Sequence, residues 1–355
     1  MAIFGDGRPS RSHSDMTSNL IAKIEAGSAL DRAESESLME QLLAGQLSDA
    51  EIVRLLIALR EKGETVDELV GFAQTIRRHA EEVFAATVRP KGVLLDTCGT
   101  GGDSSGIFNV STAAAFIAAG AGVRVAKHGN RSISSKSGSA DVFEALGVSL
   151  ETSPAKVGEA IAKVGIGFLF APAVHKAVRH AMSARRQIGT RTVFNLLGPL
   201  TNPAGATVQL VGVFSESVIE KVARALAELG VERAFVVHGL DGLDEISLSA
   251  ETIAAEVQNG SVRMFRIRAE DFGLMREPRE ALLGGDAKNN SQILVALLSG
   301  EKGPKRNLAL ANASAALVAA GLAGDFREGV RVAAQAIDSG AALAKLNALV
   351  AFLRG

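Results

Sequence analysis

The sequence predicts an α/β protein in which a mostly parallel central sheet, flanked by helices, is joined to a small all-helical domain. Two observations support this fold class. From residue 18 to about residue 88, apolar residues recur at helical spacing throughout. After Pro90 and Gly92, short β-rich runs alternate with helical runs, which is typical of a parallel sheet wrapped by helices. A length of 355 residues is sufficient for two domains.

The sequence pattern divides the chain into three parts. Residues 1–16 are polar and rich in turn residues, and we expect them to be a disordered leader. Residues 17–90 are predicted to form the helical domain, as a bundle of about four helices. Residues 91–355 are predicted to form the α/β domain. The stretch 171–200 interrupts the alternation of that domain with prolines and glycines, and we expect it to join the helical domain.

Local signals predict where particular elements begin, turn or are buried. Ser48 precedes a helical run and Glu51 follows three residues later, which predicts a capped helix start. Asn259-Gly260 lies between two strand-like runs and predicts a hairpin, and with it an antiparallel edge of the sheet. The most apolar later run, residues 308–324, is interrupted by polar residues and is short for a bilayer span, so we expect a buried helix there.

The composition indicates a soluble globular protein, with 47% hydrophobic and 22% charged residues. A formal charge of −1 gives no global electrostatic attraction to nucleic acid or to an anionic membrane, so we expect neither as a partner. Any anion must therefore be bound locally. A single cysteine excludes an internal disulfide framework, and together with the lack of a secretory signal it favours a cytoplasmic location.

The stretch DTCGTGGDSSGIFNVST, residues 96–112, follows a predicted buried strand. Its glycines would let backbone N–H groups approach phosphate oxygens, and the helix start near Ser111 adds partial positive charge. It is not the dinucleotide fingerprint, because Ser104 stands where the third glycine would be. The alternative is an ordinary flexible turn. Asp103 favours a ligand site, because a carboxylate repels phosphate unless a cation or a sugar hydroxyl lies between them.

A second polar stretch, KHGNRSISSKSGSAD at residues 127–141, also follows a strand-like run. Asp141 and Glu144 are spaced as a capping box, which predicts a helix start at that point. The alternative interpretation is a solvated loop. Because both stretches follow strands of one parallel sheet, we expect them at the same carboxyl edge, where ligands of α/β sheets bind. The gap between them suits a doubly phosphorylated sugar.

Two charged pairs are further candidates for the site. Asp244 and Glu245 follow a predicted strand, and adjacent carboxylates repel unless a cation such as Mg²⁺ neutralises them. A surface turn is the alternative. Arg185 and Arg186 are adjacent, and one guanidinium can hold a carboxylate through two parallel hydrogen bonds, whereas a solvated helix face is the more common role of such a pair.

The sequence offers no catalytic nucleophile or general base. His175 and His180 are five residues apart and cannot share a helical face as zinc ligands would, so we expect structural or surface roles for them. Nothing resembles a serine or cysteine triad, and Cys98 is expected to be packed rather than nucleophilic. We therefore predict no catalytic residue of that kind, and catalysis by electrostatics and positioning.

Five motifs, GTGGD, FNVST, KHGNRSISSKSGSAD, FNLLGPLTNP and DGLDE, together resemble the anthranilate phosphoribosyltransferase family from about Thr17 to the end of the chain. The resemblance implies the nucleoside phosphorylase type of phosphoribosyltransferase fold, with a cleft between two domains and a homodimer built through the helical part. It implies transfer of the 5-phosphoribosyl group of 5-phosphoribosyl 1-diphosphate (PRPP) to the amine of anthranilate, releasing pyrophosphate, the second step of tryptophan biosynthesis. It also implies Mg²⁺, about two ions per subunit, and leaves association with anthranilate synthase open.

Site residues follow from the resemblance position by position. Those implied to bind PRPP lie in the two glycine-bearing stretches: Gly99, Gly102, Asp103, Ile107, Asn109, Val110, Ser111, Thr112, Lys127, His128, Gly129, Asn130, Arg131, Ser132, Ile133, Ser134, Ser135 and Ser139. Those implied to bind anthranilate are Gly99, Asn130 and Arg185, and those implied to ligate Mg²⁺ are Ser111, Asp244 and Glu245. Ile107 departs from the threonine common in the family, and Val178 stands where some relatives carry an aromatic residue.

Two alternatives share the fold that the resemblance implies. A pyrimidine nucleoside phosphorylase would cleave with inorganic phosphate and would not need an acidic pair for Mg²⁺. A non-catalytic relative that binds anions or nucleic acid should be basic, and it should have lost the first glycine loop or the acidic pair. The near-neutral charge and the presence of both motifs favour the transferase.

Overall fold

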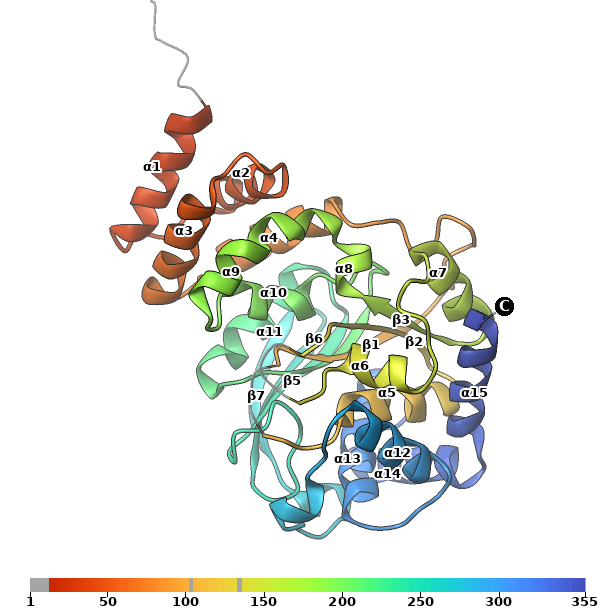
Figure 1. Cartoon of the computed structure of the whole chain (residues 1–355). Coiled ribbons are helices and arrows are strands. Elements are labelled where there is room, and N and C mark those ends of the chain that lie inside the picture. Colours follow the sequence, from red (N-terminus) through yellow and green to blue (C-terminus); the bar gives the residue numbers. More distant parts are fainter. Residues whose placement is uncertain (1–12, 102–104, 133–135, 355) are drawn as a thin grey trace, which may run out of the picture.

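A seven-stranded sheet lies at the centre of the computed structural model, which describes residues 13–101, 105–132 and 136–354 (Figure 1). The strand order is β3-β2-β1-β4-β5-β6-β7. The strands are β1 (Leu94–Gly99), β2 (Arg124–Gly129), β3 (Ile166–Phe170), β4 (Val208–Gly212), β5 (Arg233–Gly239), β6 (Thr252–Gln258) and β7 (Ser261–Ile267). The pairs among β1 to β5 are parallel, whereas β6 and β7 are antiparallel to their neighbours. The predicted fold class is confirmed.

The predicted hairpin at Asn259-Gly260 is confirmed as the turn between β6 and β7. Asn259 has φ 48° and Gly260 has φ 80°, so both lie in the left-handed region. Two such residues in a row are what a tight hairpin turn requires, because that turn matches the right-handed twist of the strands. The hairpin therefore supplies the antiparallel edge of the sheet.

One face of the sheet is covered by helices of the α/β domain. They include α5 (Val110–Gly120), α12 (Ala287–Leu298), α13 (Pro304–Ala319), α14 (Phe326–Asp338) and α15 (Ala341–Arg354). Helix α5 is alanine-rich and buried almost throughout, and its small side chains permit close packing against α13 and α15. The buried helix predicted for residues 308–324 is confirmed in α13 from Leu308 to Ala319, where all residues are buried, but the helix ends there, before the predicted end.

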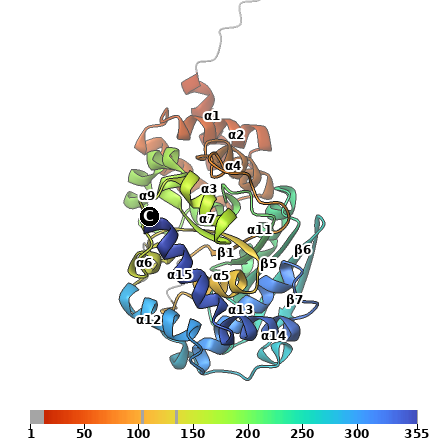
Figure 2. The same cartoon turned by 90° about the vertical axis from the view of Figure 1, so that its right-hand side faces the viewer.

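The opposite face of the sheet packs against the helical domain. This domain begins with α1 (His13–Glu25), α2 (Arg32–Leu43), α3 (Asp49–Lys62) and α4 (Val66–Arg78), which lie at one end of the molecule (Figure 2). Helices α9 (Met182–Ile188) and α10 (Val193–Leu200) pack on α3 and α4. Apolar residues of these helices, of α11 (Ile219–Glu228) and of β4, β5 and β6 form one continuous core.

Short polar caps fix the ends of the first helices. The Ser48 side chain accepts from Glu51 N, and the Glu51 carboxylate accepts from Ser48 N at 2.9 Å, so the capped helix start predicted there is confirmed.

The remaining α-helices are α6 (Ser139–Ala145), α7 (Pro154–Lys163) and α8 (Ala171–Val174). Within the described residues, no single helix is both long and apolar enough to cross a membrane; only the bent pair α14 and α15 passes that test together.

Candidate active site

Four neighbouring strands, β2, β1, β4 and β5, end in glycines at the carboxyl edge of the sheet. At the first three of these glycines, another chain segment occupies the space that a Cβ would need. Gly99 ends β1 and Gly212 ends β4, and the two are paired in register. A Cβ on Gly212 would overlap the Asp244 carbonyl, and one on Gly99 would lie 2.8 Å from Asp244 Oδ2. A Cβ on Gly129, which ends β2, would overlap the Ser139 hydroxyl. Close approach therefore requires glycine at each strand end.

The acidic pair is bonded directly to the first glycine loop. Asp244 Oδ2 accepts a hydrogen bond from Gly101 N at 3.0 Å. Glu245 Oε1 accepts from Ser111 N at 3.1 Å, in the first turn of α5, where the helix dipole favours negative charge. Residues more than 130 positions apart in sequence thus meet at one edge of the sheet. The structure brings together Gly99, Ser111, Asp244 and Glu245, all of which the sequence pointed to.

Lys127 lies beneath the glycine loop rather than on its solvent side. Its side chain is 1% exposed, and Nζ donates to Thr97 O and to Ser111 Oγ, the latter at 3.2 Å. Burial lowers the pKa of Lys127, and the nearby carboxylates of Asp96, Glu245 and Asp244 oppose that shift. Its amino group therefore lies near the acidic pair and beneath the glycine loop. A phosphate contact of Lys127 stays a prediction.

The second stretch differs from its predicted capping. Helix α6 begins at Ser139, before Asp141, because the Asp141 carboxylate reaches back to accept from Gly138 N at 2.8 Å and from Ser132 N at 3.2 Å. The predicted capping box of Asp141 with Glu144 is therefore wrong. Glu144 instead binds the exposed Arg131 guanidinium at 2.8 Å, and Arg131 also contacts Asp141 at 2.9 Å. These carboxylates raise the pKa of Arg131.

Arg185 lies on α9, which packs against α3. Its guanidinium stacks on the Phe194 ring at 5.1 Å, and its Nη1 lies 3.8 Å from Met182 Sδ. Burial lowers the pKa of Arg185. Among the residues that the structure describes, no carboxylate forms an ion pair with it, whereas the neighbouring Arg186 is exposed. A half-buried cation without a protein anion is suited to an anionic ligand.

A buried cluster beside β2 was not recognised in the sequence. His128 and His175 are 6% and 7% exposed, and their rings meet edge to face at 5.1 Å. His128 Nδ1 lies 3.2 Å from Gly198 O, while His128 Nε2 has no hydrogen-bond partner among the described residues. The ring of His175 has only a weak contact with the backbone of Thr201. Asp96 accepts from His128 N at 3.1 Å and from Asn202 Nδ2 at 2.8 Å, and burial raises its pKa.

Both histidines of this cluster remain neutral at ordinary pH. Burial lowers the pKa of each to about 4; the neighbouring His175 reinforces the shift for His128. The unfolded chain binds these protons near pH 6.5, so the free energy of unfolding must rise with pH in this range. We expect it to increase by about 1.2 kcal/mol per histidine between pH 5.5 and pH 7. Urea unfolding at the two pH values measures this change in the free energy of unfolding. In His175→Asn, which keeps one of the two histidines, the part of the change due to the cluster should be about half as large. An unchanged pH dependence in that variant would contradict the assignment.

The other predicted site residues have varied surroundings. Ile107 packs against the core and bridges to Leu283, and Val110 is buried. Thr112 is buried at the start of α5, and its hydroxyl has no partner among the described residues. Cys98 is packed in the core as predicted, and burial raises its pKa well above the usual value. Five predicted residues lie outside the described part of the chain: Gly102, Asp103, Ile133, Ser134 and Ser135.

The acidic pair suits a hard divalent cation. Carboxylate oxygens are the ligands that Mg²⁺ prefers, usually one or two of them with water and phosphate oxygens. In the described ranges 13–101, 105–132 and 136–354, no group of three or more His, Cys, Asp or Glu could hold a metal ion. Asp244 and Glu245, with the Ser111 hydroxyl nearby, therefore fit an ion that is completed by substrate oxygens, and do not form a closed protein site.

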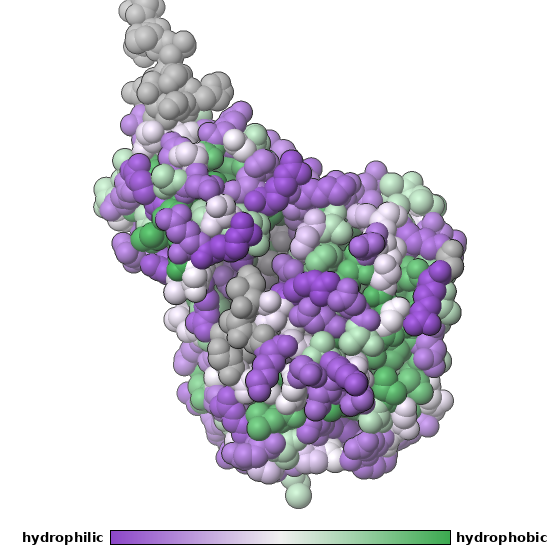
Figure 3. All heavy atoms as spheres, viewed as in Figure 1, coloured by the Kyte–Doolittle hydropathy of each residue, from purple (hydrophilic) through white to green (hydrophobic). Residues whose placement is uncertain are grey.

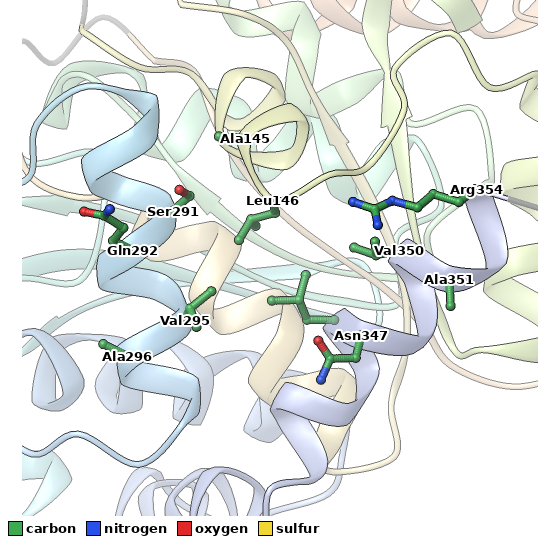
Figure 4. A pocket seen from close by; sticks show the side chains of 11 residues that line it. Ala145, Leu146, Ser291, Gln292, Val295, Ala296, Asn347, Val350, Ala351 and Arg354 are labelled. Carbon is green, nitrogen blue, oxygen red and sulfur yellow. The ribbon is translucent and has the colours of Figure 1, made fainter.

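A groove of about 630 Å³ lies apart from these residues, between α6, α12 and α15 (Figure 4). It is lined by Leu146, Val295, Leu346 and Val350 together with polar residues such as Asn347 and Arg354. In the surface view, apolar residues gather on the side where α15 lies (Figure 3). None of the predicted site residues lines this groove.

Comparison with known families defines the class of protein. Residues 18–80 match the helical bundle domain, and residues 91–343 the α/β domain, of a glycosyl transferase family. The chain is thus a glycosyl transferase with both domains of that family.

Individual relatives show which members of the glycosyl transferase family this chain is similar to. The chain is 51% identical to the anthranilate phosphoribosyltransferase of Pelotomaculum thermopropionicum, over 95% of this chain and 96% of the relative. It is 54% identical to that of Solibacter usitatus, over 91% and 94%. The crystal structure of the enzyme of Thermus thermophilus is similar with a TM-score of 0.89 and 44% identity, over 95% of this chain and 99% of that one.

A further structure, the anthranilate phosphoribosyltransferase of Saccharomyces cerevisiae in complex with PRPP and Mg, has a TM-score of 0.87 and 27% identity, over 98% of this chain and 99% of that one. The chain belongs to the anthranilate phosphoribosyltransferase family, and the resemblance predicted from its motifs is confirmed.

Proposed function

We propose that this chain transfers the 5-phosphoribosyl group of PRPP to the amine of anthranilate and releases pyrophosphate, the second step of tryptophan biosynthesis. The observation that best supports this is the acidic pair bonded to the glycine loop at the carboxyl edge of the sheet, through Asp244 to Gly101 and Glu245 to Ser111. This edge offers backbone donors, a helix start and two carboxylates, which together suit a diphosphate accompanied by a cation.

The cofactor in this proposal is Mg²⁺, about two ions per subunit. Ser111, Asp244 and Glu245 would hold it, and it would supply positive charge to the departing diphosphate. Two observations support this: the carboxylates stand next to the glycine loop, and the S. cerevisiae relative has been solved with PRPP and Mg. The buried amino group of Lys127, which donates to Ser111 Oγ, would keep that hydroxyl oriented when the ion binds.

The rest of the protein's contribution is positioning. Backbone N–H groups at Gly99 and at the start of α5 would bind the diphosphate, and the stretch from Lys127 to Ser139 would bind the remaining phosphate. As pyrophosphate leaves, C1 of the ribose develops positive character, so the attacking amine needs only to be aimed at it. Since the reaction then needs no protein nucleophile, the absence of a recognisable triad among the motifs is consistent with it.

Anthranilate would lie between the two domains, with its carboxylate on Arg185 and its ring near Gly99 and Asn130. The half-buried guanidinium of Arg185 has no ion-pair partner among the described residues, and its stacking on Phe194 holds it in place. A cation held in this way loses little conformational freedom on binding a carboxylate through two hydrogen bonds.

We expect Arg185→Ala to raise the KM for anthranilate at least about tenfold and to leave the KM for PRPP within twofold, because a charge-assisted bidentate contact contributes about 1.5–3 kcal/mol. Steady-state kinetics with each substrate varied in turn measures this. Arg186→Ala, which removes the adjacent and exposed guanidinium, is the matched control and should behave as the unaltered enzyme. Equal effects of the two substitutions would contradict the role of Arg185.

The activity itself is tested by anthranilate fluorescence, which should fall when PRPP and Mg²⁺ are added to the purified protein. Phosphorolysis of a pyrimidine nucleoside without transfer to anthranilate would instead indicate the phosphorylase alternative. We also propose a homodimer built through the helical domain, the domain boundaries predicted near residues 17 and 91, and a cytoplasmic location. Sedimentation, limited proteolysis and cell fractionation test these in turn.

A further inference from the structure

Asn290 is a buried amide whose polar atoms all contact the chain segments around the site. It lies on α12, is 3% exposed, and its Oδ1 accepts a hydrogen bond from Gly285 N at 2.8 Å. Its Nδ2 donates to Asn109 Oδ1 at 2.9 Å and to Gly285 O at 3.3 Å. Because a backbone N–H can only donate, the Gly285 contact fixes which end of the Asn290 amide is the acceptor. The NH₂ group must therefore face Asn109.

The orientation of the Asn290 amide also determines the orientation of the Asn109 amide. Since Asn109 Oδ1 accepts from Asn290, Asn109 Nδ2 points the other way and donates to Ser137 O at 3.3 Å. Asn109 stands at the start of α5 but makes no side-chain capping bond there. A directed row of hydrogen bonds thus joins three parts of the chain: the segment before α12, the glycine loop and the stretch that leads into α6.

Backbone pairing supports the same connection. Gly284 N donates to Gly106 O at 2.9 Å, and Ile107 bridges to Leu283. A Cβ on Gly284 would lie 2.7 Å from Phe108 Cα, so this segment lies directly against the back of the glycine loop. The glycine loop therefore packs against Leu283 and Gly284, which are distant from it in sequence and belong to none of the motifs.

We propose that Asn290 is a positioning residue for PRPP: it fixes the amide of Asn109 and so couples the two phosphate-binding stretches in one arrangement. This inference rests on the proposed PRPP site, in which Asn109 is a contact. Asn290 acts through Asn109 and does not itself touch the substrate. Its loss should weaken PRPP binding selectively, whereas loss of a merely structural residue would lower stability and affect both substrates alike.

The test is Asn290→Asp, which keeps the acceptor for Gly285 N but puts a second oxygen opposite both Asn109 Oδ1 and Gly285 O. Asn109 must then turn its amide, which directs its oxygen at Ser137 O. We expect the KM for PRPP to rise about three- to tenfold, as for loss of one buried hydrogen bond, with the KM for anthranilate within twofold. Gln292→Glu makes the same change of charge on the exposed face of α12, and it should leave both KM values unchanged.

Thermal unfolding and a second variant complete the experiment. Asn290→Ala removes both the donor to Asn109 and the acceptor for Gly285 N without adding charge, and it should show the same selective rise if Asn290→Asp does not fold. A KM for PRPP that stays unchanged in both variants, while Asn109→Ala raises it, would overturn the role of Asn290 and leave the proposed site standing. An equal rise in both KM values with a lowered Tm would also overturn it. If Asn109→Ala itself had no effect, the proposed site would be wrong, and this inference with it.

Discussion

The double variant Asp244→Asn, Glu245→Gln should lose Mg²⁺-dependent transfer by a factor of about 10³ or more in kcat/KM. The amides remove both negative charges but keep oxygen acceptors for Gly101 N and Ser111 N, so the loops should remain tethered. What is lost is the charge that would hold the ion beside the diphosphate. Anthranilate fluorescence at increasing Mg²⁺, together with circular dichroism to verify folding, measures this.

A matched control uses another adjacent acidic pair. Glu81 and Glu82 lie outside the site, in the segment that follows α4, and Glu81 pairs at the surface with Lys176. Their replacement by glutamine should leave the activity and its Mg²⁺ dependence unchanged, since surface ion pairs contribute little. Should the Asp244 and Glu245 variant retain full activity at the same Mg²⁺ concentration, the acidic pair could not be the metal site.

We expect Gly212→Ala to be nearly as damaging, although Gly212 carries no functional group. The added Cβ would overlap the Asp244 carbonyl and lie 2.5 Å from its carbon, and these are backbone atoms that cannot rotate away. Either the end of β4 or the segment carrying Asp244 must move. Displacement of a binding group by about 1 Å can cost about 100-fold in rate, and overpacking typically costs about 1–3 kcal/mol of stability.

The same substitution at Gly198 is the control. Gly198 lies in α10, near His128, and a Cβ there would meet nothing within 4 Å. Gly198→Ala should therefore keep its activity but should not gain in stability, because the following Pro199 disfavours a helical conformation for a residue that carries a Cβ. Urea unfolding and kcat/KM of both variants separate the two cases. Normal activity in Gly212→Ala would show that the position of Asp244 is not critical.

The features that the sequence predicted correctly depend on short-range patterns. The hairpin at Asn259-Gly260 requires only two residues that tolerate positive φ, and the helix start at Ser48 only a capping residue and Glu51. The expectation that two polar stretches meet at one sheet edge follows from parallel strand pairing. The predicted capping box of Asp141 with Glu144 was wrong, because the Asp141 carboxylate accepts from Gly138 N and Ser132 N, which precede it in the chain. Spacing alone does not predict whether an acidic side chain caps the residues before it or those after it.

The burial of charged side chains against residues distant in sequence could not be predicted. Lys127 belongs to a polar stretch of the sequence, yet it is in β2 and reaches Thr97 O, 30 residues earlier in the chain. The buried carboxylate of Asp96 accepts from Asn202 Nδ2, 106 residues later in the chain, and from His128 N, 32 residues later. The roles of individual site residues came from family resemblance, since charge and spacing alone could not separate a ligand contact from a solvated loop.

The continuous apolar core between the helical domain and the sheet has a consequence for how the chain can be divided. Val211, Val236 and Ala255 on the strands share that core with Leu69 and Phe72 of α4. A fragment starting at residue 91 would expose this surface to water, and an isolated N-terminal fragment would lack its counterpart. We therefore expect the two matched domains to unfold as one cooperative unit, so that exchanging one half with that of a distant relative would require exchange of the opposing core residues as well.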